Sequence, residues 1–357
     1  MYNPVTTEYP IPHHFCQNFF ALPRLCALRP EIDDAKTKVI SKSPLLKSIL
    51  LSDFEAMRPD VVGVLQGEYA VIPDGLLLLN RSGNWFSINT PLDNPLWARI
   101  PFDKINTNDA RTLRHSILEN WDSIPLADNT LVMSTIWSNY YHYTFDVAPK
   151  SRLGEQLKFT NVYIPEDMTK NRYQESLLAR TLDSTPRVTT GVMRVRNPIL
   201  AECMQSRDSL LWLRHKMKIA TAPGRRRLLV RRAKGRARVG NNIAPTPEFI
   251  ELLTRYGFEI VDFGSGELSI EEQVELLNGA EVVLAPHGAG LTNLAYLNGP
   301  LTVIEIFAAN LLYSCFLKLS MHLDFRYYGM IEQSVDGAGD ILTDVDELER
   351  VLRECLG

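Results

Sequence analysis

The sequence predicts an α/β protein built from two compact units, and three observations support this. Its length of 357 residues suits two domains of roughly 100–200 residues each, which we place at residues 1–205 and 206–357. In the second range, short apolar runs alternate with amphipathic helical segments, as in a parallel sheet covered on both faces. In the first range, apolar runs are separated by turn residues, so the parallel sheet is expected to be clearest in the C-terminal half.

Composition narrows the class of protein further. Hydrophobic residues make up 45% of the chain and charged residues 22%, which fits a folded globular protein and excludes a disordered or collagen-like chain. No run reaches the roughly 18 apolar residues of a membrane span, and the N-terminus lacks the pattern of a secretory signal. The five cysteines are scattered without a Cys-x-x-Cys pair, which favours a reducing compartment.

Elements of the first range are predicted from apolar runs and the turn or cap residues beside them. Residues 1–59 show no pattern that can be assigned. Pro73-Asp74-Gly75 forms a turn between strands, and Asn139 is expected to cap an aromatic helix. In order, we expect strands at 61–65, 69–72 and 76–79, a helix at 110–118, a strand at 131–137, a helix at 140–147, a strand at 161–165 and a helix at 173–182.

Elements of the second range follow a stricter alternation. Thr246 and Ser269 are expected to cap helices, and the last helix begins after Thr343 with acids in its first turn. In order, we expect a strand at 228–230, a helix at 247–255, a strand at 258–261, a helix at 270–277, a strand at 281–285, a helix ending near 297, a strand at 301–307, a helix at 311–319 and a strand at 325–328. Parallel sheets of this kind bind ligands beyond the carboxyl ends of their strands.

The run Ala-Pro-His-Gly-Ala-Gly-Leu-Thr-Asn at 285–293 joins a strand to a helix at that edge. Small residues let the backbone approach a ligand, and the first amides of a helix favour an anion such as a phosphate. Each dipole contribution is about 0.3–1 kcal/mol when exposed, so tight binding requires added cations. His287 can donate one more hydrogen bond. The alternative is a tight turn that needs glycine, with His287 bonded to the backbone.

Other known loop types do not fit this run. Gly288-x-Gly290-x-x-Asn293 lacks the third glycine of a dinucleotide fingerprint and follows a late strand. A Walker loop would continue with Gly-Lys-Ser/Thr, and the Gly-x-Ser-x-Gly elbow of a serine hydrolase does not occur. The sequence therefore argues against a nicotinamide cofactor, a P-loop and a serine nucleophile.

Charged residues also lie near the expected ligand edge. Glu305 stands inside an apolar strand, where a carboxylate needs donors, which sugar hydroxyls or a salt bridge to an arginine would supply. Eight Arg and Lys residues lie between Arg225 and Arg238 with no acid among them. Arg231 directly follows Val230, and its guanidinium could donate two hydrogen bonds to a diphosphate. Most of the other basic residues in this run are expected to form a solvated face. Nucleic acid is a weaker alternative, because the net charge is −4 and no nucleic-acid-binding module is recognisable.

His142 and Asp146 are four residues apart and therefore share one face of the predicted aromatic helix. Either side chain could take a proton from a hydroxyl, and the choice between them is left open. His142 is the first candidate, because the imidazole of histidine titrates near neutrality. The alternative is that the helix is a core element.

Metal-ligand patterns are weak. His13-His14-x-Cys16 has no spaced companion pair. Asp344-Val345-Asp346 resembles the Asp-x-Asp of metal-dependent sugar transferases, but its place at a helix start favours capping.

The motifs occur in the order Asn139-Tyr140-Tyr141-His142, Arg226-Arg227-x-x-x-x-Arg231, Arg238-Val239-x-Asn241, Gly257-Phe258-Glu259, the loop at 285–293 and Val303-Ile304-Glu305. This order resembles glycosyltransferase family 61. The resemblance covers about residues 130 to 330 and is stronger in the second half. The family includes bacterial capsular-polysaccharide-type enzymes, plant xylan-decorating transferases and the eukaryotic extracellular O-linked N-acetylglucosamine transferase.

The resemblance implies a GT-B fold, in which two Rossmann-like domains face a cleft, and an inverting transfer that requires no metal ion. It implies a nucleotide sugar on the C-terminal domain, with a UDP-sugar as the favoured co-substrate and no other cofactor. Tyr141 is expected on the acceptor side, with His142 or Asp146 as the catalytic base. The residues expected to bind the donor are Arg231, Arg238, Asn241, His287, Gly288, Ala289, Gly290, Asn293 and Glu305.

This chain departs from the family pattern at two places. Tyr143-Thr144 stands where the family often has Trp-Leu. Asn242 stands where it usually has Glu, which removes a charge near the arginines and bears on donor preference.

We therefore expect an inverting, metal-independent glycosyltransferase that moves a sugar from a nucleoside diphosphate to a hydroxyl of a glycan or glycolipid in polysaccharide, capsule or lipopolysaccharide synthesis. Arginines and helix-start amides would neutralise the departing diphosphate in place of a divalent cation. A catalytically silent nucleotide-sugar-binding module and an arginine-mediated polyanion binder are the alternatives. We expect a bacterial cytoplasmic protein, at most peripheral at the inner membrane face, without a nucleic-acid partner; homodimerisation is left open.

Overall fold

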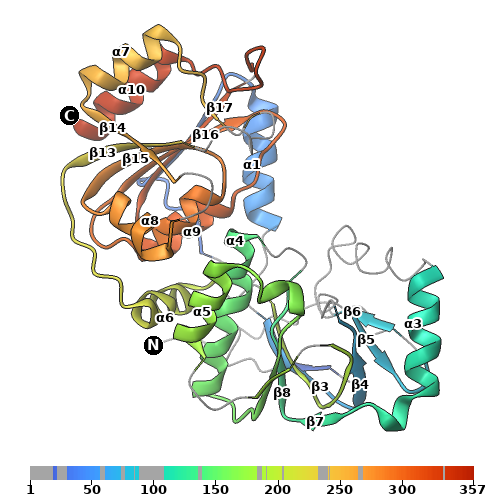
Figure 1. Cartoon of the computed structure of the whole chain (residues 1–357). Coiled ribbons are helices and arrows are strands. Elements are labelled where there is room, and N and C mark those ends of the chain that lie inside the picture. The colour runs from blue at the N-terminus through green and yellow to red at the C-terminus, as the bar shows by residue number, and fades with distance from the viewer. Residues whose placement is uncertain are drawn as a thin grey trace. The chain divides into compact units, whose positions relative to one another are not determined.

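The computed structural model describes residues 30–56, 61–73, 77–83, 85–87, 108–135, 139–182, 187–189, 191–202, 205–231, 240, 242–263, 268–332 and 334–357, together with the backbone of strand β1 (Phe19–Ala21). The chain divides into two compact units (Figure 1). Unit 1 comprises residues 1–28 and 58–206, and unit 2 comprises residues 29–57 and 207–357. Each unit is described by itself below.

Unit 2 is built on a six-stranded sheet in which every neighbouring pair is parallel. This confirms the parallel sheet predicted for the C-terminal half. The strands lie in the order β14 (Phe258–Asp262), β13 (Arg226–Arg231), β15 (Ala280–Pro286), β16 (Thr302–Ala308), β17 (Arg326–Glu332) and β2 (Thr37–Ser41). The division differs from the predicted one, because β2 pairs with β17 and brings residues 29–57 into this unit.

The strand order identifies where a ligand is expected on this sheet. Strands β13 to β17 follow the doubly wound order 2-1-3-4-5, with β2 added at the edge. In such a sheet the chain leaves β13 in one direction and β15 in the other, and the crevice between their carboxyl ends is the usual ligand site. Arg231 ends β13 and Pro286 ends β15, so the loop that begins at His287 lies at this switch point.

Helices cover both faces of the sheet (Figure 1). Helices α7 (Pro247–Arg255) and α10 (Val345–Leu356) lie side by side on one face, over a core that includes Leu229, Leu284 and Ile304. The elements α8 (Ile270–Leu277), η6 (Ala289–Tyr296) and α9 (Cys315–Leu323) lie on the other face, and α1 (Pro44–Ala56) and α6 (Arg207–Met217) contact α9. The result is a three-layer α/β/α unit.

The helix starts follow the capping rules that the sequence suggested. Thr246 accepts a hydrogen bond from the Phe249 amide at 3.3 Å, and Asp344 accepts one from Glu347 at 3.1 Å. Ser269 forms a capping box with Glu272, in which each side chain bonds the other's backbone amide. Two predictions were less accurate. The segment after Gly288 is a 3₁₀ helix, and the helix predicted at 311–319 runs from 315 to 323.

Unit 1 contains two mixed sheets. The first has the order β1, β3 (Val61–Leu65), β12 (Ile199–Glu202), β8 (Thr130–Val132), β9 (Asn161–Tyr163) and β10 (Arg187–Thr189), and is parallel only from β12 to β10. The second has the order β6 (Trp85–Ser87), β5 (Leu77–Asn80), β4 (Glu68–Val71), β11 (Met193–Arg196) and β7 (Leu126–Asp128). Unit 1 thus differs from the expected second Rossmann-like domain, because several of its strand pairs are antiparallel. Short connections account for the pairs β4–β5 and β5–β6, which are consecutive in the chain.

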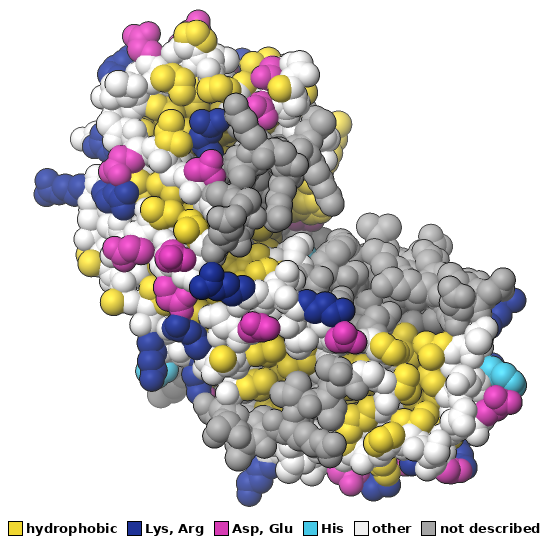
Figure 2. Space-filling model, viewed as in Figure 1, with side chains coloured by type: hydrophobic (Ala, Val, Ile, Leu, Met, Phe, Trp, Pro, Cys, Tyr) yellow, Lys and Arg dark blue, Asp and Glu magenta, His cyan; other side chains and the backbone are white. Residues whose placement is uncertain are grey.

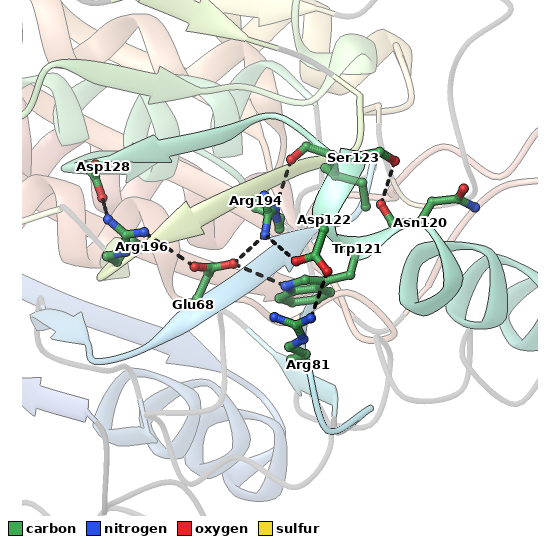
Figure 3. A network of polar contacts seen from close by, with 10 residues as sticks. Glu68, Arg81, Asn120, Trp121, Asp122, Ser123, Asp128, Arg194 and Arg196 are labelled. Atoms are coloured by element: carbon green, nitrogen blue, oxygen red, sulfur yellow. Dashed lines mark hydrogen bonds and ion pairs between the residues drawn. The ribbon is translucent and has the colours of Figure 1, made fainter.

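A polar network ties the second sheet of unit 1 to its helical cover (Figure 3). Glu68 of β4 accepts hydrogen bonds from Arg194 of β11 at 2.9 Å and from the Trp121 indole at 3.2 Å. The Arg194 guanidinium also lies 5.8 Å from the centre of the Trp121 ring.

The helices that the structure describes in unit 1 are α3 (Asn108–Glu119), η2 (Trp121–Ser123), α4 (Tyr140–His142), η3 (Tyr143–Val147), η4 (Ala148–Glu155), η5 (Glu166–Met168) and α5 (Arg172–Thr181).

Gly240 lies against the end of β16 at the carboxyl edge of the sheet in unit 2. It adopts a φ of 82°, and a Cβ atom there would lie only 2.5 Å from the Cβ of Ala308, the last residue of β16. We expect Gly240→Ala to lower the free energy of unfolding by roughly 1–3 kcal/mol, measured by urea denaturation. Gly257→Ala is the matched control, because Gly257 has a φ of 67° with open space around it. Equal losses in the two variants would contradict the close approach.

Across the described segments, no helix has both the length and the apolar composition that crossing a membrane requires.

Candidate active site

His287 lies directly beyond the carboxyl end of β15. Its backbone amide donates to the Ile306 carbonyl at 2.9 Å, which continues the ladder with β16 for one residue. Its ring stacks on Phe307, with centroids 5.3 Å apart and planes inclined by 21°. Only 9% of the His287 side chain is exposed, so the imidazole can present no more than one edge to a ligand.

Glu305 and Tyr327 hold the His287 ring from the side away from that edge. Glu305 is fully buried in the middle of β16, and its Oε1 lies 2.6 Å from His287 Nδ1. The Tyr327 hydroxyl donates to Oε2 of the same carboxylate, also at 2.6 Å. Burial and the adjacent carboxylate raise the pKa of Tyr327 well above its ordinary value, so the phenol keeps its proton and donates. A carboxylate at Nδ1 assigns the ring proton to that nitrogen and turns Nε2 toward the ligand edge.

This placement differs from the expectation that Glu305 receives ligand hydroxyls. Both of its oxygens are already occupied, and the side chain has no exposed surface. The salt-bridge alternative named an arginine, whereas the partner is His287. Glu305 therefore orients the His287 ring. Gly329 of β17 is the strand partner of Glu305 in β16, and because glycine has no Cβ, it leaves room for the Tyr327 ring.

Gly290 lies between the ends of β13 and β14. A Cβ atom at this position would stand 3.3 Å from Val230 Cγ1 and 3.4 Å from the Phe263 ring. The glycine therefore lets the start of η6 approach the switch point closely. Arg231 follows Val230 at the end of β13 and is partly exposed. Among the described residues, its guanidinium has no hydrogen-bond or ion-pair partner. Arg231 and the His287 loop thus follow neighbouring strands at the same switch point of the sheet.

The other arginines of the basic run that the structure describes have different roles. Arg226 donates to both oxygens of Glu259 and to the carbonyls of Leu276 and Asn278, at the amino end of β13. Arg227 donates to the Tyr256 carbonyl at 2.7 Å. Figure 2 shows Lys and Arg side chains interspersed with Asp and Glu on the visible described surface. The mixed charges on this surface do not support the alternative of a polyanion-binding site there.

The remaining donor-site candidates divide into three groups. Gly288 and Ala289 begin η6, where the first amides of a helix have no partner within the helix. Asn293 is fully buried, and its amide donates to Gln273 of α8 at 3.0 Å, so it contributes to packing η6 on α8. Two further predicted residues, Arg238 and Asn241, lie outside the described residues, as does the His13-His14-x-Cys16 pattern.

His142 and Asp146 meet as the sequence predicted. Asn139 caps the helix by accepting from the His142 amide at 3.2 Å. The helix widens to π geometry over Tyr143–Val147, and His142 Nδ1 lies 2.6 Å from Asp146 Oδ2. About a quarter of the His142 side chain is exposed, against 14% of the Asp146 side chain. The contact engages Nδ1, so proton exchange with a substrate would take place at Nε2.

A second layer of side chains fixes Asp146. The Gln205 amide nitrogen donates to Asp146 Oδ1 at 2.6 Å, and the Tyr141 hydroxyl donates to Gln205 Oε1 at 3.2 Å. Burial alone would raise the pKa of Asp146, but the hydrogen bonds from His142 and Gln205 and the charge of Lys150 outweigh it and lower this pKa. Asp146 therefore stays ionised at neutral pH. This favours His142 as the base, with Asp146 as the group that orients it.

The chain matches the family model of glycosyltransferase 61 over residues 14–304, most of its length. The chain belongs to glycosyltransferase family 61. The resemblance drawn from its motifs is thereby confirmed, and the protein is a glycosyltransferase with a sugar donor and an acceptor as substrates. None of the curated proteins matches it.

The family match ends at Ile304, so two residues that hold His287 in this glycosyltransferase lie beyond it. Sequence reasoning did not identify Tyr327 as part of the site, nor Gln205 in unit 1. Tyr327 could have been found from the period-two pattern of β17, which places it on the face opposite to Tyr328 and Met330 of the α7–α10 core. Gln205 lies 59 residues from Asp146, and no local signal links the two.

Asp344 of the Asp-x-Asp pattern is a cap, since its carboxylate accepts from the Glu347 amide and pairs with Lys42. Within the segments that the structure describes, no group of three or more His, Cys, Asp or Glu side chains could hold a metal ion.

Proposed function

We propose that this protein is an inverting, metal-independent glycosyltransferase that uses a nucleoside-diphosphate sugar, with a UDP-sugar as the favoured donor. The observation that carries the proposal is the ring of His287, locked by Glu305 at the switch point of the parallel sheet, opposite the unengaged Arg231. A cation and an imidazole at the carboxyl ends of neighbouring strands, with glycines in the loop between strand and helix, suit a diphosphate.

In the proposed reaction the acceptor is a hydroxyl of a glycan or glycolipid. His142 Nε2 takes the hydroxyl proton while the acceptor oxygen forms a bond to the anomeric carbon from the face opposite the diphosphate. The bond from the anomeric carbon to the diphosphate oxygen breaks, and its electron pair stays on the diphosphate. Attack from the opposite face inverts the anomeric configuration.

The charge that develops on the departing diphosphate is stabilised by unit 2. Arg231 supplies a full positive charge and the first amides of η6 supply aligned dipoles. His287 keeps a proton on Nδ1 for Glu305, and in its imidazolium form it also donates a hydrogen bond from Nε2 to the diphosphate. These groups would take the place of a divalent cation. A GT-B arrangement, in which unit 1 presents the acceptor across a cleft, belongs to the same proposal, as does a role in capsule, polysaccharide or lipopolysaccharide synthesis.

Calorimetric titration with nucleoside diphosphates tests the donor site. We expect the wild type to bind at least one of UDP, GDP and ADP, and Arg231→Ala combined with His287→Ala to weaken that binding by about 100-fold or more, because each charge-assisted hydrogen bond contributes roughly 1.5–3 kcal/mol. Arg231→Ala alone removes no described contact and should weaken binding about 10-fold. Failure of the wild type to bind, or undiminished binding by these variants, would overturn the proposal.

The matched control is Arg255→Ala combined with His115→Ala. Arg255 of α7 is half exposed and pairs with Glu349, and three quarters of the His115 side chain is exposed on α3. This double variant removes the same two residue types and should bind the nucleotide as the wild type does.

A further inference from the structure

Tyr313 stands beside His287 with its ring open to solvent. It lies between β16 and α9, and 49% of the residue is exposed. The centroids of the Tyr313 and His287 rings are 5.9 Å apart, and the ring planes are inclined by 38°. The two other rings against His287, those of Phe307 and Phe316, are buried. Tyr313 is therefore the member of this aromatic cluster that can meet a ligand, whereas the buried rings fix the imidazole.

The position of Tyr313 is fixed by the residue that follows it. Ser314 donates to Asp53 of α1 through both its backbone amide, at 2.7 Å, and its hydroxyl, at 2.8 Å. On the other side, Leu312 packs against a buried core cluster that includes Leu50 of α1 and Phe307 of β16. A tyrosine anchored on both sides loses little conformational freedom when a ring stacks on it, which lowers the cost of binding.

We propose that Tyr313 is the stacking platform for the nucleobase of the donor, an inference that rests on the proposed function. Along the carboxyl edge, Arg231 ends β13 on one side of β15, and Tyr313 follows β16 on the other. A diphosphate held between Arg231 and His287 can therefore extend one of its two substituents over Tyr313.

The chemistry around Tyr313 favours the base over the sugar. Its ring lies against the His287 ring, and the side chain of the next residue, Ser314, is already bonded to Asp53. A hexose or pentose brings several hydroxyls that lose free energy when they are left without hydrogen bonds, whereas a nucleobase offers an unbroken π face. A flat, apolar, half-exposed ring satisfies a base with stacking alone.

The test compares two probes on the full chain by calorimetry: inorganic pyrophosphate, and whichever of UDP, GDP and ADP binds the wild type best. Tyr313→Ala should weaken nucleoside diphosphate binding by about 10- to 100-fold and leave pyrophosphate binding within about twofold. Tyr313→Phe keeps the ring and should retain wild-type affinity for both. Ile260→Ala is the matched control, because Ile260 is 52% exposed on β14, at the far edge of the sheet.

Each of the other possible results would contradict a different part of the proposal. Unchanged nucleoside diphosphate binding by Tyr313→Ala would exclude the platform, and if the KM for the nucleotide sugar then rose, the ring would belong to the sugar. An equal loss for both probes would show that Tyr313 supports the phosphate site and not the base. Failure of the wild type to bind either probe would instead overturn the proposed donor site itself.

Discussion

Glu305→Ala is expected to lower the free energy of unfolding by roughly 3–5 kcal/mol, the largest loss of stability that we expect from a single substitution in unit 2. Removing one partner of a buried, hydrogen-bonded charge pair costs this much because the other partner is left without compensation. Here the substitution leaves His287 Nδ1 and the Tyr327 hydroxyl without their acceptor and opens a cavity beneath them. Thermal denaturation of a unit of this size should shift down by about 6–20 °C.

Two further variants separate the parts of this effect. Tyr327→Phe removes one of the two donors to Glu305 and should cost about 1–2 kcal/mol, clearly less than Glu305→Ala. Glu251→Ala is the control, because this carboxylate is 78% exposed and lies 4.0 Å from the Arg255 guanidinium, at the limit of an ion pair. It should change stability by less than about 0.5 kcal/mol. A Glu305→Ala protein as stable as the control would contradict the buried His287–Glu305–Tyr327 cluster.

The strand and helix alternation of unit 2 could be predicted because the signals are local. Continuous apolar strands, with Thr246 and Ser269 as caps between them, specify a parallel sheet with helices on both faces. The sixth strand could not be predicted. Strand β2 (Thr37–Ser41) pairs with β17, nearly three hundred residues later in the chain. Its five residues are of mixed polarity, so nothing in their pattern predicts a strand or its partner.

The two histidine pairs show the same distinction between local and distant information. His142 and Asp146 share a helix face by spacing alone, so their contact was predictable even though the helix widens to π geometry. The place of Glu305 near the ligand edge was also predictable, but its orientation was not. Helices cover both faces of the sheet, and β16 is apolar on both sides. The sequence therefore does not show toward which face the Glu305 side chain points.

His142→Ala is expected to reduce transfer by about 10²- to 10⁴-fold, the usual contribution of a general base. The measurement is the nucleoside diphosphate released per enzyme, using the nucleotide sugar that stabilises the wild type in a thermal-shift screen. Calorimetric affinity for the nucleoside diphosphate should stay unchanged, because the proposed donor site lies in unit 2. Turnover within tenfold of the wild type would exclude His142 as the base.

Asp146→Asn tests the orienting role without removing the histidine. Tyr141 donates to Gln205 Oε1, which directs the Gln205 amide nitrogen at residue 146. An asparagine there would give its oxygen to Gln205 and its nitrogen to His142 Nδ1, and the ring proton would move to Nε2, the atom that has to accept one. We therefore expect a loss of turnover close to that of His142→Ala, with the chain still folded.

The control for both variants is His115→Ala. His115 pairs with Glu119 at the same i, i+4 spacing, 3.0 Å apart, but three quarters of its side chain is exposed on α3. If proximity of a carboxylate were enough to make a histidine important, this variant would lose turnover as well. Full activity in His115→Ala, together with the loss in His142→Ala and Asp146→Asn, would tie catalysis to the partly buried pair that Gln205 and Tyr141 hold in place, because this further layer of hydrogen bonds fixes the proton positions of the pair.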